Sequence, residues 1–133
     1  MTTTRKALSL LFGCICGGAI VLACFSDRSA GPVNSAAECR VPVTVIDSLH
    51  FLIAIRDFAF HPDSLSVPPG ATVTWINCED AGQEPHTTTS DGAVWNSPDL
   101  SPGNRFSHTF PTGGAFPYHC TPHPFMTGKV VVQ

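Results

Sequence analysis

Short strand-like segments separated by strong turn signals run from about residue 43 to the end of the chain. The turns are marked by the stretches PPG, SPG and PTGG, which interrupt any helical period. Between them, ATVTWIN (71–77) and NRFSHTF (104–110) alternate apolar and polar side chains, as a strand with one buried face does. This pattern predicts an all-β domain, a small antiparallel β-sandwich with Greek-key connections.

The composition agrees with this assignment. Pro (12) and Gly (11) are frequent and only 13% of residues are charged, which favours short strands over long helices. In AFPYHC, the alternation places Tyr118 and Cys120 on one face of a strand and His119 on the other. The other segments expected to form strands are FLIAI (51–55), LSV (65–67), AFPYHC (115–120) and GKVVVQ (128–133).

The first 24 residues are typical of an export signal. Arg5 and Lys6 precede an uncharged apolar stretch that ends in small residues before Cys24. The tetrapeptide VLAC resembles the bacterial lipobox, which makes Cys24 a candidate for lipidation; ordinary cleavage near Ala23 is the alternative. A permanent transmembrane helix is a weaker alternative, because the stretch is short and contains three glycines.

Export defines the expected organisation and location. The chain divides into a signal peptide (1–24), a flexible tether (25–42) and a folded domain (43–133). We expect the protein in a bacterial periplasm or cell envelope, in contact with the membrane only through a lipid on Cys24. Without Arg5 and Lys6, five basic residues face ten acidic ones, a net charge of −5, which argues against nucleic acid as a partner.

Export also decides how the cysteines are interpreted, because an oxidising compartment permits disulfides. Two of the six cysteines lie inside the leader, Cys24 is the lipidation candidate and Cys120 belongs to a motif described below. Cys39 and Cys78 are therefore the unassigned pair. A bridge between them would close a loop of about forty residues and stabilise the fold by about 4 kcal/mol. The alternative is two free, partly buried thiols.

The stretch YHCTPHPFMTGKVVVQ places two residues between Cys120 and His123, and two between His123 and Met126. Thiolate and thioether are soft ligands and imidazole suits copper, so this cluster predicts copper, whereas structural zinc sites make no use of Met. Met126 is the only Met besides Met1. A trigonal copper site of two His and one Cys with a weak axial Met needs a second histidine. His86, in EPHTTTS after a predicted strand, is the best candidate.

The remaining histidines fit a ligand role less well. His50 lies early in a strand region and His61 precedes a proline in a turn. His108 shares a predicted strand face with two Phe, which is typical of a packed core histidine. His119 adjoins Cys120, but strand alternation directs it to the opposite face, so we interpret it as a surface or packing residue.

With these residues, the chain from about His50 to Gln133 resembles the cupredoxins, the type 1 blue copper proteins, and is most similar to their amicyanin-like branch. The resemblance is carried by YHCTPHPFMTGKVVV, by the dipeptide PH before Thr87 and by DFAFHPDSLSVPPGATVTWIN. It implies one copper ion and the ligand set His86, Cys120, His123 and Met126.

Two departures from the family pattern concern the surroundings of the site. The family usually has Asn after the first His ligand, where its side chain ties the two ligand loops together, and this chain has Thr87. The resemblance implies that the Thr87 backbone N–H donates to the Cys120 sulfur, with Thr121 also next to the ligands. The loop CEDAGQE is a few residues longer than in the amicyanin-like branch and adds Glu79, Asp80 and Glu84 near the expected site; we expect it to be a solvated acidic loop.

The resemblance implies a single-electron carrier and not an enzyme. Pro122, Pro124 and Phe125 surround His123 and form an apolar patch. We expect a redox donor and a redox acceptor to dock there weakly, and the protein itself to be a monomer. The alternative function is storage, delivery or sensing of copper, although the chain has none of the Met-rich or His-rich tracts that such proteins often expose.

Overall fold

The computed structural model describes Cys39 and residues 45–133; the expected signal peptide, Cys24 and most of the tether lie outside the described residues. All regular elements in the described part are strands. They are β1 (His50–Arg56), β2 (Ala59–His61), β3 (Ser64–Val67), β4 (Ala71–Asn77), β5 (Thr89–Ser90), β6 (Arg105–Phe110), β7 (Gly114–His119) and β8 (Thr127–Val132). Among the residues described, there is no helix with the length and apolar character needed to cross a membrane.

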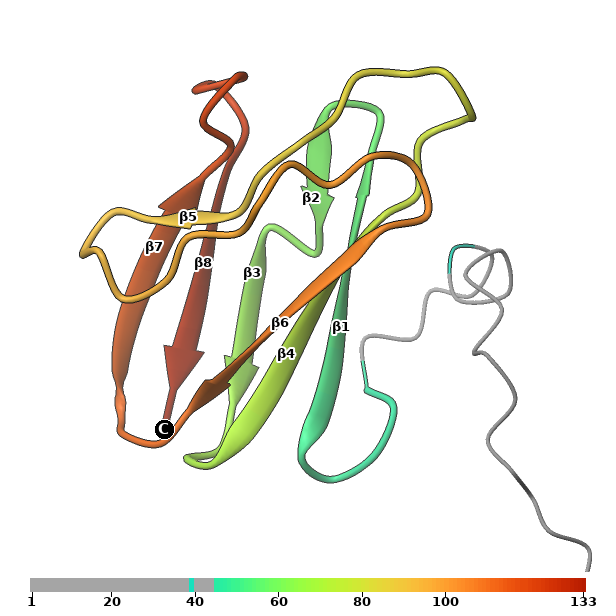
Figure 1. The fold of residues 1–133 in the computed structure, drawn as a ribbon. Helices are drawn as coiled ribbons and strands as arrows, with labels where there is room; N and C mark the ends of the chain where they lie inside the picture. The colour runs from blue at the N-terminus through green and yellow to red at the C-terminus, as the bar shows by residue number, and fades with distance from the viewer. Residues whose placement is uncertain (1–38, 40–44) are drawn as a thin grey trace, which may run out of the picture.

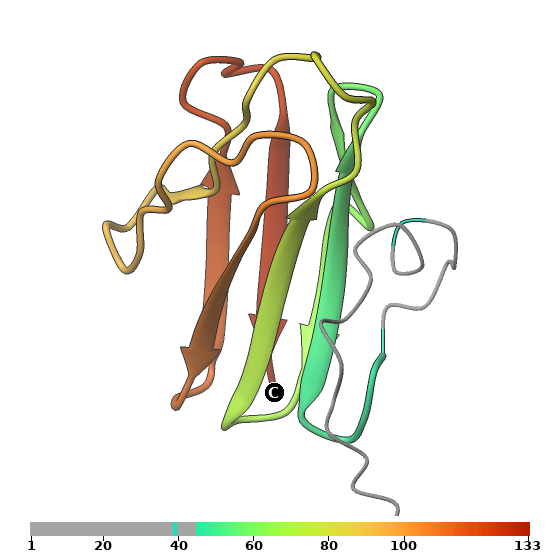
Figure 2. The ribbon, with the colours of Figure 1, turned by 45° about the vertical axis from the view of Figure 1, so that its right-hand side comes forward.

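The strands form two four-stranded sheets that pack face to face (Figure 1, Figure 2). The strand order is β2-β1-β4-β6 in one sheet and β3-β8-β7-β5 in the other. The predicted β-sandwich is thus confirmed. Each sheet also contains one parallel pair, β1 with β4 and β3 with β8, which the sequence pattern did not predict. Parallel neighbours need a long connection, and β2 and β3 lie within the one that links β1 to β4.

The core lies between the sheets and follows the alternation of β4. Val73 and Trp75 are fully buried, while Thr72 and Thr74 on the other face are half-buried. Trp75 packs edge-on against Tyr118 of the opposite sheet, with ring centroids 5.5 Å apart. Burial of each such large side chain contributes roughly 1.5–3 kcal/mol, so this contact helps to hold the two sheets together.

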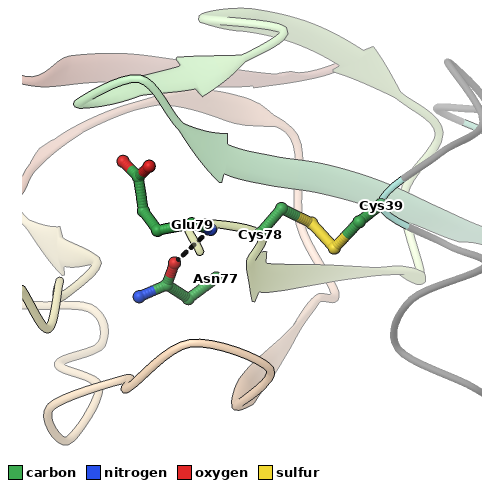
Figure 3. Close-up of a disulfide and its surroundings, with 4 residues drawn as sticks. All are labelled: Cys39, Asn77, Cys78 and Glu79. Atoms are coloured by element: carbon green, nitrogen blue, oxygen red, sulfur yellow. Dashed lines mark hydrogen bonds between the residues drawn. A yellow bond between two sulfur atoms is a disulfide. The ribbon is translucent and has the colours of Figure 1, made fainter. Parts of the chain in front are cut away.

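A disulfide lies where β4 ends. Cys39 and Cys78 are bonded, with their Cα atoms 5.4 Å apart (Figure 3). The Cys78 backbone N–H donates to the Ile55 carbonyl at 2.7 Å, and the next residue, Glu79, donates its N–H to Asn77 Oδ1 at 2.9 Å. The start of the acidic loop is therefore held by the disulfide and by these two hydrogen bonds.

Three connections meet at one end of the sandwich, the upper end in Figure 1. They are the β1–β2 turn, the segment after β4 and the loop between β7 and β8. The segment after β4 carries His86 and the β7–β8 loop carries Cys120 and His123, so the fold brings together residues that lie far apart in the sequence.

Candidate metal centre

The side chains of His86, Cys120 and His123 converge at this end of the sandwich. The two Nδ1 atoms lie 3.2 Å apart, and Cys120 Sγ lies 3.7 Å from His86 Nδ1 and 3.6 Å from His123 Nδ1. His86 and Cys120 are fully buried and His123 is half-buried. Across Cys39 and residues 45–133, no other group of three or more His, Cys, Asp or Glu side chains is arranged to hold a metal ion.

The three donor atoms fit a single transition-metal ion. Bonds of about 2.0 Å to imidazole nitrogen and about 2.3 Å to thiolate sulfur, at angles of about 100–120°, place the donors of one ion roughly 3.1–3.7 Å apart. All three measured separations fall in this range. One thiol with two imidazoles is also the donor set that copper accepts in trigonal sites.

The loop from Cys120 to Met126 is closed by its own backbone. The N–H of Cys120 donates to the Met126 carbonyl at 3.0 Å, His123 N–H to the Cys120 carbonyl at 3.2 Å, and Met126 N–H to the His123 carbonyl at 2.9 Å. Pro122 and Pro124 restrict the same loop by fixing their φ angles. Met126 is buried beneath it, and its role as an axial ligand stays a prediction.

His86 is held by a short bridge to a neighbouring segment. Its N–H donates to the Leu100 carbonyl at 3.1 Å, and its carbonyl accepts the Leu100 N–H at 2.8 Å. The buried Asn77 Nδ2 also donates to the Leu100 carbonyl, at 2.7 Å. Leu100 thereby connects the end of β4 to His86.

Thr87 makes two contacts that connect the ligand loops. Its backbone N–H donates to Cys120 Sγ at 3.3 Å, and its hydroxyl accepts the Thr121 N–H at 2.8 Å. A hydroxyl is thus sufficient for the link that the family usually makes with Asn. The N–H directed at the Cys120 sulfur is a contact of the kind that orients a metal-binding side chain.

The electrostatic surroundings favour a neutral imidazole at His86. Burial lowers the pKa of His86, the nearby His123 lowers it further, and the carboxylates of Glu79 and Glu84 oppose this effect. His86 Nε2 lies 3.4 Å from Glu79 Oε1, a contact that is ionic only when the imidazole is protonated and that lacks hydrogen-bond geometry. Because a neutral imidazole is the form that coordinates a metal, His86 is prepared for binding.

Sequence reasoning missed Phe58 at the site and expected Glu79 near it only as part of a solvated loop. Phe58, in the β1–β2 turn, packs edge-on against both His86 and His123. The side chain of Glu79 is only 10% exposed, although the loop as a whole was expected to be solvated and Asp80 and Glu84 are exposed. Neither residue belongs to a motif, and only the closeness of Glu79 to the strand end could have indicated its role.

The histidines that fit a ligand role less well in the sequence lie elsewhere. His50 pairs with Asp47 at 2.8 Å, and His61 is exposed. His108 is half-buried and stacks on Trp95, with centroids 5.1 Å apart. His119 Nδ1 lies 2.6 Å from Asp91 Oδ1, directed away from the cluster.

Comparison with known proteins defines the family. Residues 48–133 match the model of the copper binding proteins of the plastocyanin/azurin family, and the chain belongs to this family. It is 33% identical to amicyanin of Paracoccus denitrificans over the full length of both chains. The predicted resemblance to the cupredoxins and their amicyanin-like branch is confirmed, and the predicted cofactor, one copper ion, agrees with both family and donor set.

Two solved structures show the same fold. A reduced tryptophan-to-tyrosine variant of amicyanin is 34% identical and has a TM-score of 0.59, with 66% of this chain and 86% of the other covered. A purple cupredoxin from Nitrosopumilus maritimus is 32% identical with a TM-score of 0.56, and the alignment covers 62% of this chain and 98% of the other.

Proposed function

We propose that this protein is a single-electron carrier with a type 1 blue copper site. His86, Cys120 and His123 would hold the copper ion, with Met126 as the weaker fourth ligand. The observation that carries this proposal is the buried set of one thiol and two imidazoles at separations of 3.2 to 3.7 Å. Bound copper supplies one-electron chemistry as it alternates between Cu(I) and Cu(II).

The residues around the site keep the donors in place when the charge changes. Cys120 and His86 are shielded from water, and the backbone hydrogen bonds of the loop hold Cys120 and His123 at a fixed spacing. The Thr87 N–H stabilises negative charge on the sulfur. A site restrained in this way needs little rearrangement when an electron arrives or leaves, as a carrier requires.

His123 is the expected point of electron entry and exit. It is half-buried, and the exposed side chains of Pro122, Pro124 and Phe125 lie around it. Phe125 is 72% exposed, and its ring centroid lies 6.0 Å from that of His123. We propose that a redox donor and a redox acceptor dock on this apolar patch in turn, each with a small interface that permits rapid release.

The cellular setting is part of the same proposal. The export pattern of residues 1–24 supports a place in a bacterial periplasmic or envelope redox chain, with Cys24 as the site of a lipid anchor. The carrier is expected to act as a monomer.

The test is to load the protein with Cu(II), record its visible spectrum and follow its reduction. We expect an intense blue band that is absent in Cys120→Ser and retained in the matched control His119→Gln, which alters the neighbouring residue directed away from the cluster. A colourless site would contradict the proposal. Copper that a mild chelator removes at once would instead support a role in copper delivery.

A further inference from the structure

Phe58 has a backbone conformation that its side chain does not favour. Asp57 and Phe58 form the two-residue turn between β1 and β2, with φ angles of 52° and 54°. Two successive positive φ angles match a tight hairpin turn, for which Asn and Gly are the preferred residues. A bulky residue in this region is a true outlier, and such strain gathers where the surroundings enforce it for function.

The Phe58 ring lies against both predicted imidazole ligands. Its centroid is 5.3 Å from that of His86 and 5.0 Å from that of His123, and each pair of ring planes meets at 89°. Phe125 contacts His123 from farther away. Among the described residues, Phe58 is the one aromatic side chain recorded against both imidazoles.

The turn that carries Phe58 is anchored to the segment after β4. The Phe58 backbone N–H donates to Glu79 Oε1 at 2.9 Å, and the same oxygen lies 3.4 Å from His86 Nε2. Glu79 is itself fixed by Asn77 Oδ1 and follows the disulfide-bonded Cys78, as Figure 3 shows. The position of the ring is therefore set by contacts outside its own hairpin.

We propose that Phe58 is a positioning residue for the copper site. Its ring limits the rotation of His86 and His123 and covers the edges that water would otherwise reach, so the two Nδ1 atoms stay directed at one ion. This inference rests on the proposed copper site. It adds a residue that contacts no donor atom of the metal and acts through the two imidazoles.

A role for Phe58 that is confined to the turn predicts a different result from a role in positioning the imidazoles. If Phe58 only completes the turn, Phe58→Gly, which adopts a positive φ without strain, should change the unfolding midpoint of the metal-free protein but neither its copper release nor its reduction potential. If the ring positions the imidazoles, the same variant should lose copper to a chelator about tenfold faster, because two aromatic contacts are removed. Its reduction potential should shift as well.

The matched control is Ala93→Gly. Ala93 has a φ of 57° and is exposed in the turn after Ser90, outside the copper cluster. This variant relieves similar strain, and we expect it to release copper at the wild-type rate with the wild-type potential. Phe58→Tyr retains the ring and should also behave as the wild type.

A readout without copper separates this inference from the proposed function. In the metal-free protein, the ring-proton NMR signals of His86 and His123 should shift and broaden in Phe58→Gly but not in Ala93→Gly. If the wild-type protein forms no blue site, this result contradicts only the proposed function. Wild-type copper release, potential and imidazole signals in Phe58→Gly would overturn the role of Phe58. Failure of both Phe58→Gly and Phe58→Asn to fold would also overturn it, because Phe58 would then be required for the turn itself.

Discussion

Thr87 is hydrogen-bonded to Thr121 across the two loops that carry the predicted ligands: the Thr121 backbone N–H donates to Thr87 Oγ1 at 2.8 Å. The Thr87 N–H donates in turn to Cys120 Sγ at 3.3 Å. Because Thr87 follows His86 and Thr121 follows Cys120, one buried residue links the two halves of the site. The Thr87 hydroxyl therefore takes the place of the amide side chain that most family members have there.

Replacing Thr87 with Val should weaken this link while keeping the shape of the side chain and the N–H to sulfur. We expect the free energy of unfolding to fall by about 1 kcal/mol and copper to be lost faster to a chelator. Denaturant titration and timed chelation measure these two effects. Thr72→Val is the control, because Thr72 bonds to Thr109 at 2.8 Å at the opposite end of β4. Equal copper loss in both variants would refute a specific role of Thr87.

The disulfide between Cys39 and Cys78 should contribute strongly to stability. It joins residues separated by 39 positions, and closing a loop of this length lowers the entropy of the unfolded chain by an equivalent of about 4 kcal/mol. We expect the double variant Cys39→Ser and Cys78→Ser to unfold at a clearly lower denaturant concentration than the wild type. A reducing agent should lower the wild-type midpoint and leave that of the double variant unchanged. An unchanged wild-type midpoint on reduction would show that the bridge adds little.

The sequence predicted those parts of the protein whose determinants are local. The alternation of β4 identifies its buried face, and the two-residue spacing in the last loop brings Cys120 and His123 together within a single loop. Phe58 was not predictable in this way. Its contact with Glu79 spans 21 positions. Its positive φ occurs in a turn that contains neither Gly nor Asn, the residues that would indicate such a conformation in the sequence. The parallel pairing of β1 with β4 likewise depends on how the sheets assemble, which the hydrophobic periodicity of the single strands does not predict.

The half-buried His108 should make stability depend on pH. Burial lowers the pKa of His108 below its ordinary value of 6.5. The unfolded chain then binds a proton at a higher pH than the folded protein, so the free energy of unfolding should fall as the pH drops below about 6.5. His108→Phe keeps the ring stacked on Trp95 but removes this titration.

Denaturant titrations of both proteins across this pH range test the prediction. His86 also has a lowered pKa, but it is present in both proteins and cancels in the difference between them. At about pH 8, His108 is neutral in both the folded and the unfolded state, which gives the reference difference. We expect the wild type to lose stability relative to His108→Phe on acidification. A constant difference would mean that His108 is not shielded from water.

The Tyr118 ring occupies the space that a side chain at position 128 would fill. The two residues face each other in the β7–β8 ladder, and a Cβ atom on Gly128 would overlap the Tyr118 ring and its hydroxyl. Tyr118 is 1% exposed and packs against Phe60, with centroids 4.8 Å apart, so the ring has little room to move. Because Cys120 follows two residues later, a displaced Tyr118 would also displace the thiol.

We therefore expect Gly128→Ala to lower the free energy of unfolding by about 1–3 kcal/mol and to alter the visible spectrum of the copper-loaded protein. Gly92→Ala is the control, since its Cβ would meet its nearest neighbours at 3.9 Å, an ordinary contact. Adding Tyr118→Leu to Gly128→Ala should restore part of the lost stability, because the two side chains compete for one space. If the effects of these two substitutions simply add, Gly128 does not act through Tyr118.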